Sequence, residues 1–186
     1  MQLFGDNSHL YTRMIERAKE GDRRAQKAIY DSLADKMYAI CLRYMGNREE
    51  AYDVFQDGFV SLFAKLDTYT GDGSFEGWAR KIFVNTALMS LRKNDVLKES
   101  DDVEEARSVS SDAPSALQDL GYKELSRMIA ELPAGYRTVF NMFVVEGYSH
   151  DEIADALGIS VTTSRSQLLR ARAILQAKIL GNKKKK

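Results

Sequence analysis

The segment from residue 147 to residue 160 constrains the fold of this chain more than any other stretch. Ser149 suits the start of a short helix, and Glu152 follows three residues later, which is the spacing of a capping box. Gly158 fits the left-handed backbone position that ends a helix, and Ser160 suits the start of a second, longer one. A short helix, a glycine turn and a capped long helix predict a helix-turn-helix, whose second helix enters the major groove of DNA.

The second helix, predicted over residues 161 to about 180, has one packed side and one exposed side. The packed side holds Val161, Ser164, Leu168, Ala171 and Leu175. Side chains that hydrogen-bond to bases face outward at its start, namely Thr162, Thr163, Arg165, Ser166 and Gln167. Three basic residues further along suit phosphates, namely Arg170, Arg172 and Lys178. The alternative is a helical hairpin with a solvated basic face, but the caps, the glycine and the outward polar set together favour DNA binding.

The distribution of charge supports this interpretation, although 27 basic and 27 acidic residues leave the chain neutral. Residues 1–94 carry a net charge of +1, residues 95–120 carry −6 and residues 121–186 carry +5. A basic C-terminal region is the pattern expected for contact with phosphates. The stretch 95–115 is acidic, rich in serine and without aromatic residues. Because such a stretch cannot bury enough apolar surface to offset its chain entropy, we predict a flexible linker there.

Helical periodicity elsewhere predicts an all-α fold. Apolar residues recur at helical spacing over residues 10–42 with a break near residue 21, and again over 51–66, 76–93, 116–132 and 136–146. Only two prolines interrupt the chain, and no stretch shows the alternation of a β-strand. We therefore predict two small helical domains, residues 1–94 and 116–186, joined by the acidic linker 95–115, with the helix-turn-helix in the second domain.

An acidic face is predicted on the helix 51–66. Asp53, Gln56 and Asp57 are spaced by three and four residues, so they share one side of the helix, opposite its apolar stripe. A solvated face is the ordinary interpretation of such a set.

A basic and amide stripe is predicted on the helix 76–93. It holds Lys81, Asn85, Leu88 and Arg92, with Lys93 at the end of the helix. The preceding loop brings two aromatic residues, Tyr69 and Phe75, beside this stripe. Such a surface suits single-stranded or opened DNA, because unpaired bases stack on aromatic rings. The alternative is that Phe75 and Trp78 are core residues, and for Trp78 we predict this.

Composition argues against several other classes of protein. Cys41 is the single cysteine and lies in an apolar stretch, so we predict core filler in a reducing compartment. His9 and His150 are isolated, and no glycine loop of a phosphate-binding enzyme is present. We expect no enzymatic activity, no metal and no cofactor. The N-terminus lacks a signal sequence and no apolar run is long enough to span a membrane, which predicts a soluble cytoplasmic protein.

Four motifs, in this order and spacing, resemble the extracytoplasmic-function (ECF) sigma factors of the sigma-70 family. They are Asp53-x-x-Gln56-Asp57-x-Phe59, Trp78-x-x-x-Ile82-x-x-Asn85-x-Ala87-x-x-x-Leu91-Arg92, Leu132-Pro133 with the segment 147–160, and Arg170-Ala-Arg172. The resemblance covers nearly the whole chain outside the linker. Within the family, the stretch 164–168 is similar to sigma factors from the Bacteroidota.

The resemblance implies a role for each surface. The acidic face Asp53, Gln56 and Asp57 would dock on the β′ clamp helices of core RNA polymerase, and the polymerase β flap is a further expected contact. Promoter DNA at the −10 element would contact Tyr69, Phe75, Lys81, Asn85, Leu88, Arg92 and Lys93. The −35 element would contact Thr162, Thr163, Arg165, Ser166, Gln167, Arg170 and Arg172. The linker would thread toward the active-site cleft, and an anti-sigma factor is an expected partner because many relatives are held by one.

The chain departs from the family pattern at several positions. Asp57 stands where a glutamate is common, Val84 where a basic residue is common, and Met89 where an aspartate is common. The run Thr162-Thr-Ser-Arg-Ser-Gln167 stands where Gly-Thr-Val-Lys-Ser-Arg is usual. This last departure affects the promoter sequence more than the implied function, transcription initiation with core polymerase. The competing hypothesis is a helix-turn-helix regulator that does not engage polymerase, which would leave the acidic face and the stripe around Asn85 without a role.

Overall fold

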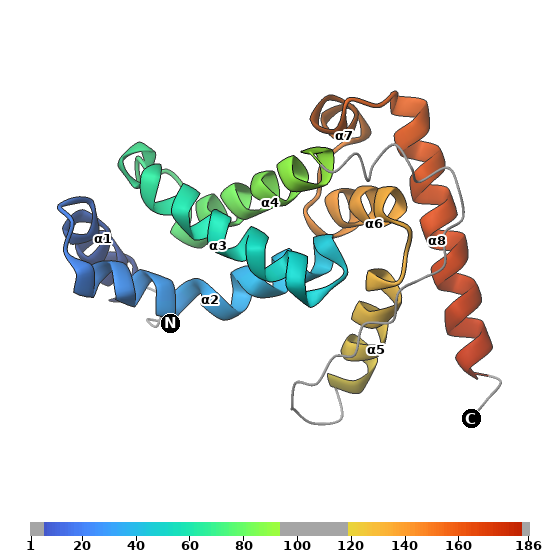
Figure 1. Cartoon of the computed structure of the whole chain (residues 1–186), viewed down its shortest axis with the longest axis horizontal. Helices are drawn as coiled ribbons and strands as arrows, with labels where there is room; N and C mark the ends of the chain where they lie inside the picture. Colours follow the sequence, from blue (N-terminus) through green and yellow to red (C-terminus); the bar gives the residue numbers. More distant parts are fainter. Residues whose placement is uncertain (1–5, 94–118, 184–186) are drawn as a thin grey trace. The chain divides into compact units, whose positions relative to one another are not determined.

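The computed structural model describes residues 6–93 and 119–183, and throughout them the regular structure is helical (Figure 1). The all-α prediction is thus confirmed. The helices are α1 (Asp6–Lys19), α2 (Arg23–Met45), α3 (Arg48–Ala64), η1 (Leu66–Thr68), α4 (Phe75–Lys93), α5 (Asp119–Ala130), α6 (Ala134–Phe140), η3 (Asn141–Val145), α7 (His150–Leu157) and α8 (Val161–Lys183). The predicted linker lies outside the described residues.

Contacts divide the chain into two compact units that alternate along the sequence. Unit 1 comprises residues 1–41 and 52–86, and unit 2 comprises residues 42–51 and 87–186. All three divisions fall inside helices, so α2, α3 and α4 each contribute to both units. The domain boundaries predicted at residues 94 and 116 stay a prediction.

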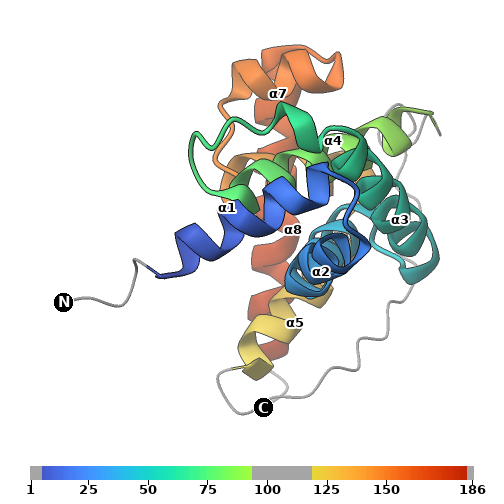
Figure 2. The ribbon, with the colours of Figure 1, turned by 90° about the vertical axis from the view of Figure 1, so that its left-hand side faces the viewer.

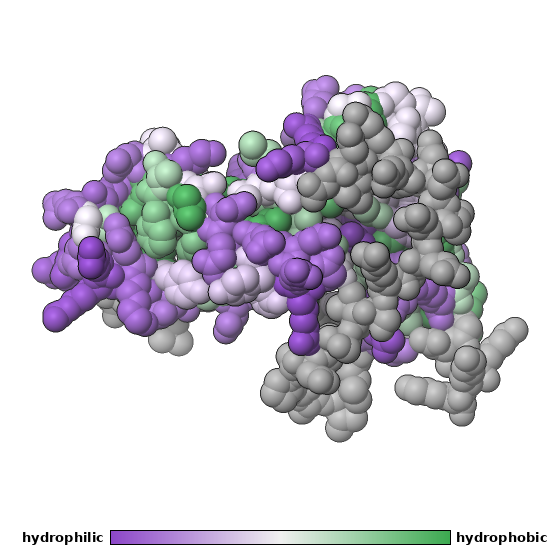
Figure 3. All heavy atoms as spheres, in the orientation of Figure 1, coloured by the Kyte–Doolittle hydropathy of each residue, from purple (hydrophilic) through white to green (hydrophobic). Residues whose placement is uncertain are grey.

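Unit 1 is built around an aromatic core. The ring of Phe59 lies 5.1 Å from that of Phe55, 5.1 Å from that of Phe83 and 4.5 Å from that of Tyr30, measured between centroids. α3 comes close to α4 at Gly58, since a Cβ atom there would fall 2.4 Å from the Phe83 ring. The sides of α3 and α4 that face away from this core are exposed. Hydrophilic residues are prominent on the surface of this unit in Figure 3.

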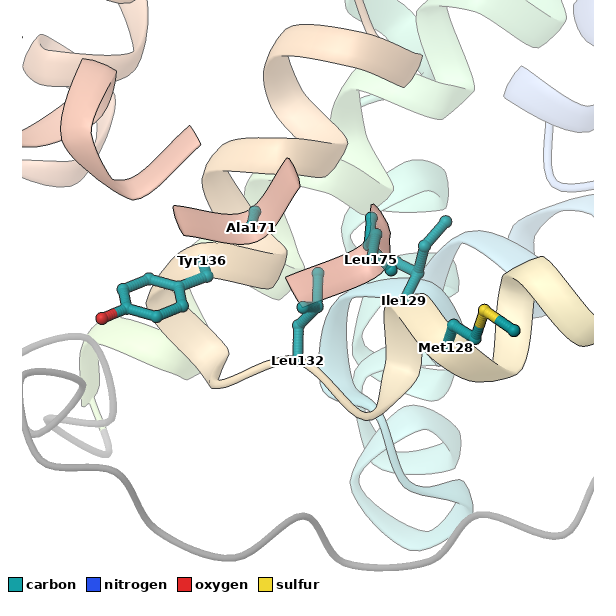
Figure 4. Close-up of a cluster of buried hydrophobic side chains, with 6 residues drawn as sticks. All are labelled: Met128, Ile129, Leu132, Tyr136, Ala171 and Leu175. Carbon is teal, nitrogen blue, oxygen red and sulfur yellow. The ribbon is translucent and has the colours of Figure 1, made fainter. Parts of the chain in front are cut away.

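The C-terminal helices of unit 2 pack around an apolar cluster contributed by α5, the α5–α6 connection, α6 and α8. Its members are Met128, Ile129, Leu132, Tyr136, Ala171 and Leu175 (Figure 4). Pro133 precedes α6, as predicted. The helix predicted over 136–146 is in fact α6 followed by the π-helical turn η3, a change that apolar periodicity could not reveal.

A buried arginine organises the polar part of unit 2. The guanidinium of Arg137 donates hydrogen bonds of 2.9 Å to the carbonyl oxygens of Tyr44, Met45, Ala130 and Leu132. Three of these carbonyls belong to the C-terminal ends of α2 and α5, where helical carbonyls lack partners within their own helix, and that of Leu132 lies in the α5–α6 connection. Burial lowers the pKa of Arg137 to about 10, so it remains charged at neutral pH. The four bonds offset part of the cost of burying that charge.

Candidate nucleic-acid interface and docking face

The helix-turn-helix forms with the caps that the sequence predicts. The Ser149 hydroxyl accepts a hydrogen bond from the amide of Glu152 (3.2 Å), and the Glu152 carboxylate accepts one from the amide of Ser149 (2.7 Å). The backbone amide of Ser149 is the main cause of a lowered pKa for Glu152. Gly158 ends α7 in the left-handed conformation, with φ of 67°, and the Ser160 hydroxyl accepts from the amide of Thr163 (2.9 Å). Figures 1 and 2 both show α7 beside the N-terminal end of α8.

The start of α8 exposes part of the predicted set of base-contacting residues. Thr162 and Arg165 are exposed, whereas Thr163 and Ser166 are half-buried. The Ser166 hydroxyl donates to the carbonyl of Thr163 (2.9 Å), so it is engaged within its own helix. The prediction for Gln167 was wrong, because only 6% of it is exposed. It lies 60° from Ser164 around the helix, on the flank of the side that packs.

Leu169 is a surface residue that the sequence argument missed. It is 70% exposed on α8. At 100° per residue it falls on the same side as Thr162, Arg165 and Arg172. The same calculation on the sequence would have placed this apolar side chain outside the packed side. An apolar side chain in that position suits the methyl group of a thymine.

The inner polar position of α8 is satisfied by α7. Ser164 is fully buried, and its hydroxyl lies 2.9 Å from Nδ1 of His150. The His150 ring in turn stacks on Phe143 of η3, with centroids 4.5 Å apart. The guanidinium of Arg172 lies 5.9 Å from the centroid of that same Phe143 ring. Ser164 thus joins the two helices of the motif by a hydrogen bond where an apolar residue is common.

The two arginines predicted to contact phosphates are exposed, and each lies against an aromatic ring. Arg170 donates to the Tyr136 hydroxyl (3.1 Å) and lies 5.9 Å from the centroid of that ring. Arg172 lies over Phe143, as described above. Such contacts hold the guanidinium groups near the surface of the domain while leaving them exposed. Lys178, a further candidate for phosphate contact, pairs instead with Glu131 at 2.6 Å.

The stripe on α4 is exposed as predicted at Lys81, Asn85, Arg92 and Lys93. Leu88 is buried, so its inclusion in the stripe was wrong. Helical spacing shows which residues lie on the same side of a helix. It does not show which edge of that side is covered by neighbouring helices. Met89 was missed, although it is 68% exposed beside Asn85 and Arg92. It stands where the family commonly has an aspartate.

The aromatic residues at the start of α4 are placed differently from the prediction. Phe75 is buried, and Trp78, predicted as core, is half-buried. The two rings stack with centroids 5.5 Å apart, and the half-buried Tyr69 ring lies 5.2 Å from Phe75 and 5.3 Å from Trp78. Tyr69 and Trp78 are therefore the rings that remain accessible to a base, while the buried Phe75 ring contacts both of them.

The acidic face on α3 is exposed as predicted at Asp53, Gln56 and Asp57. Two apolar residues accompany it: Tyr52 and Val60, the latter 70% exposed. Val60 lies three residues beyond Asp57 and four beyond Gln56, so it continues the same face. A face that combines carboxylates with exposed apolar side chains has the composition of a protein contact. The positions of Tyr52 and Val60 in the helix sequence could have revealed these two apolar residues.

Other kinds of site find little support in the described part of the chain. Cys41 is buried, and burial raises the pKa of its thiol to about 12. In residues 6–93 and 119–183, no three His, Cys, Asp or Glu side chains are arranged to hold a metal ion. A search of the same residues also finds no helix that is long and apolar enough to cross a membrane.

Comparisons with known proteins agree on one family. Models of sigma-70 region 2 and of sigma-70 region 4 match residues 29–96 and 122–175. The ECF RNA polymerase sigma-E factor of Haemophilus influenzae is 26% identical over 177 residues, covering 89% of this chain and 93% of the relative. The RNA polymerase sigma-H factor of Pseudomonas aeruginosa is 28% identical over 170 residues, covering 86% and 88% respectively.

Among solved structures, the fold is similar to that of a sigma factor bound to an anti-sigma factor. It is the sigma factor RpoE in complex with the anti-sigma factor NepR from Bartonella quintana. The TM-score is 0.52 at 22% identity, over 81% of this chain and 94% of that chain.

Proposed function

The chain belongs to the sigma-70 family as an ECF sigma factor, and we propose that its exposed faces divide polymerase docking, −10 recognition and −35 recognition among α3, α4 and α8. It is a transcription initiation factor that binds core RNA polymerase and directs it to promoters. The observation that carries this function is the presence of both sigma-70 regions, in order, on one chain. A helix-turn-helix regulator that does not engage polymerase would not require sigma-70 region 2.

At the −35 element, the exposed side of α8 is the proposed contact surface. Thr162 and Arg165 lie in its first turns, where side chains reach base edges, and Leu169 adds an apolar group suited to a thymine methyl. Arg170 and Arg172, further from the helix start, would contact phosphates. The burial of Gln167 supports assigning it to the packing of α8.

At the −10 element, the proposed contact surface is the exposed side of α4 with the aromatic rings of its first turn and of the preceding loop. Lys81, Asn85 and Arg92 supply charge and amide groups, and Lys93 extends the charge to the end of the helix. Tyr69 and Trp78 supply partly exposed rings on which an unpaired base can stack.

Docking on the β′ clamp helices is assigned to the face of Asp53, Gln56 and Asp57, with Val60 included. Charged residues at the rim of an interface steer association, while apolar side chains between them supply the buried area. Contact with the polymerase β flap, an anti-sigma factor as a partner, the absence of enzymatic activity and of a cofactor, and a cytoplasmic location all belong to the same proposal. So do the domain boundaries 1–94, 95–115 and 116–186 and the similarity to Bacteroidota sigma factors.

Run-off transcription from fragmented genomic DNA with core polymerase tests the proposed function. We expect discrete start sites that appear only when the chain and core polymerase are both present. The matched control is core polymerase with the chain carrying Asp53→Lys and Asp57→Lys, which should lose those start sites. Sequence-specific binding of the chain alone to promoter DNA, with no start sites in the presence of core polymerase, would favour the regulator that does not engage polymerase.

A further inference from the structure

α1 forms one wall of a groove in unit 1 whose other wall is the loop between η1 and α4. The groove has a volume of about 490 Å³. Its lining includes Tyr11, Ile15 and Lys19 from α1, together with Tyr69, Ser74 and Phe75 from the loop side. The loop carries one of the two rings proposed to accept an unpaired base, so a residue that sets the position of the loop also sets the shape of that surface.

Two contacts tie α1 to the loop. The Lys19 ammonium group donates a hydrogen bond of 3.1 Å to the carbonyl oxygen of Tyr69, fifty residues further along the chain. The Tyr11 ring lies 6.2 Å from the Phe75 ring, at an angle of 42° between the planes. α1 itself is anchored by the buried side chains of Ile15 and Ala18, so these contacts connect the loop to a fixed element.

The other contacts described for the loop lie within it or with the adjoining ends of η1 and α4, where Ser74 accepts hydrogen bonds from the amides of Gly77 and Trp78 and the Tyr69 ring packs on Phe75 and Trp78. The Tyr69 hydroxyl donates to the carbonyl of Gly73 (2.9 Å), and the Thr70 hydroxyl donates to Asp72 (2.8 Å), so both bonds remain inside the loop. Gly71 adopts a positive φ of 91°, and Gly73 one of 79°, which permits the turn but adds backbone freedom. Internal bonds fix the shape of the loop, whereas contacts with another element are needed to fix its place.

We propose that α1 is a positioning element for −10 recognition, acting through Lys19 and Tyr11 on the loop that carries Tyr69. Lys19 holds the backbone at the start of the loop, and Tyr11 supports the Phe75 ring beneath Tyr69 and Trp78. Without these contacts the rings would sample more orientations, and an unpaired base would be held with less selectivity. This proposal rests on the proposed function, because it concerns the same DNA-contacting surface.

The test is transcription by core polymerase from a pooled promoter library randomised at both elements, with the transcripts sequenced. Lys19→Met keeps the aliphatic stem and removes the donor, whereas Lys19→Arg keeps a donor. We expect Lys19→Met to lower enrichment at the −10 positions by about fivefold, the scale of one lost hydrogen bond, with −35 enrichment unchanged. Lys19→Arg should restore the −10 profile. Tyr11→Leu, which retains an apolar side chain, should change it in the same direction as Lys19→Met.

The matched control is Lys27→Met, on α2. Lys27 is an exposed lysine that pairs with Asp31 and does not line the groove. It should leave both profiles unchanged. Affinity for core polymerase and the melting temperature should stay at the wild-type values for Lys19→Met, because Lys19 is exposed.

Each outcome is decisive for one proposal. If the wild-type chain enriches no sequence at the −10 positions, the proposed function fails. If the wild-type chain does so and Lys19→Met gives the same −10 profile, the positioning role of α1 is overturned. A loss shared equally by the −10 and −35 positions, together with a lower melting temperature, would also overturn it, since it would show a purely structural role for α1.

Discussion

Replacing Gly58 by alanine places two opposite effects in competition at the contact between α3 and α4. Alanine favours a helix interior over glycine by about 1 kcal/mol. The added Cβ, however, would lie 2.4 Å and 2.5 Å from two atoms of the Phe83 ring, well inside van der Waals contact. Phe83 is fully buried, with Phe55 and Phe59 packed around it, so the ring has no free space into which to turn.

We expect the steric effect to exceed the gain in helix propensity. Overfilling a packed core costs about 1–3 kcal/mol, so Gly58→Ala should destabilise the protein by up to about 2 kcal/mol. For a chain of this length that corresponds to a fall in melting temperature of about 2–4 °C per kcal/mol. Urea and thermal unfolding followed by circular dichroism would measure it.

The double variant Gly58→Ala with Phe83→Leu provides the control. The shorter leucine side chain removes the ring atoms that the new methyl group meets, so in this background Gly58→Ala should be neutral or stabilising. Equal destabilisation in both backgrounds, or an unchanged melting temperature of the single variant, would refute the argument. The prediction also concerns function, because this contact supports the proposed docking face of α3 and the proposed DNA-contacting side of α4.

Three further predictions address polymerase docking, −35 recognition and the buried arginine of unit 2. Reversing the charge of Asp53 and Asp57 should weaken binding to core polymerase, by at least about 1.5 kcal/mol if close charge pairs form, while circular dichroism shows normal melting. Arg165→Ala should reduce the free energy of promoter binding by about 1–3 kcal/mol and relax selectivity at one −35 base pair. Arg172→Ala should weaken binding to all sequences alike and reduce the salt slope of the binding constant by about one. Binding to a set of single-base promoter variants at several salt concentrations would measure both effects. A uniform loss for Arg165→Ala would make it a backbone contact. Arg137→Met should lower the free energy of unfolding by roughly 3–5 kcal/mol, because it leaves buried carbonyls without a donor. A free energy of unfolding within about 1 kcal/mol of wild type, obtained from urea titrations, would contradict the capping role.

The helix-turn-helix shows how far local sequence determines this protein. Ser149, Glu152 and Gly158 act within four residues of the backbone groups that they cap, so their roles follow from spacing alone. The exposure of Asp53 and Asp57 followed from helical geometry in the same way, because the apolar stripe of α3 is continuous and leaves the opposite side free. All-helical structure and the order of the elements are local properties of this kind.

Tertiary structure alone decided which edge of each helix is covered. Leu88 and Gln167 lie at the margins of their exposed arcs, where the position of a neighbouring element, and not the periodicity of the helix, determines burial. Phe75 is buried for the same reason, since its ring lies beside that of Tyr11 in α1, an element distant in sequence. Arg137, which reaches carbonyls 92 and 93 residues away, gave no signal in the sequence that set it apart from a solvated arginine. The hydrogen bond from Lys19 to the carbonyl of Tyr69 likewise forms only because folding brings α1 beside the loop. The two residues are fifty positions apart, so no local sequence pattern predicts this contact.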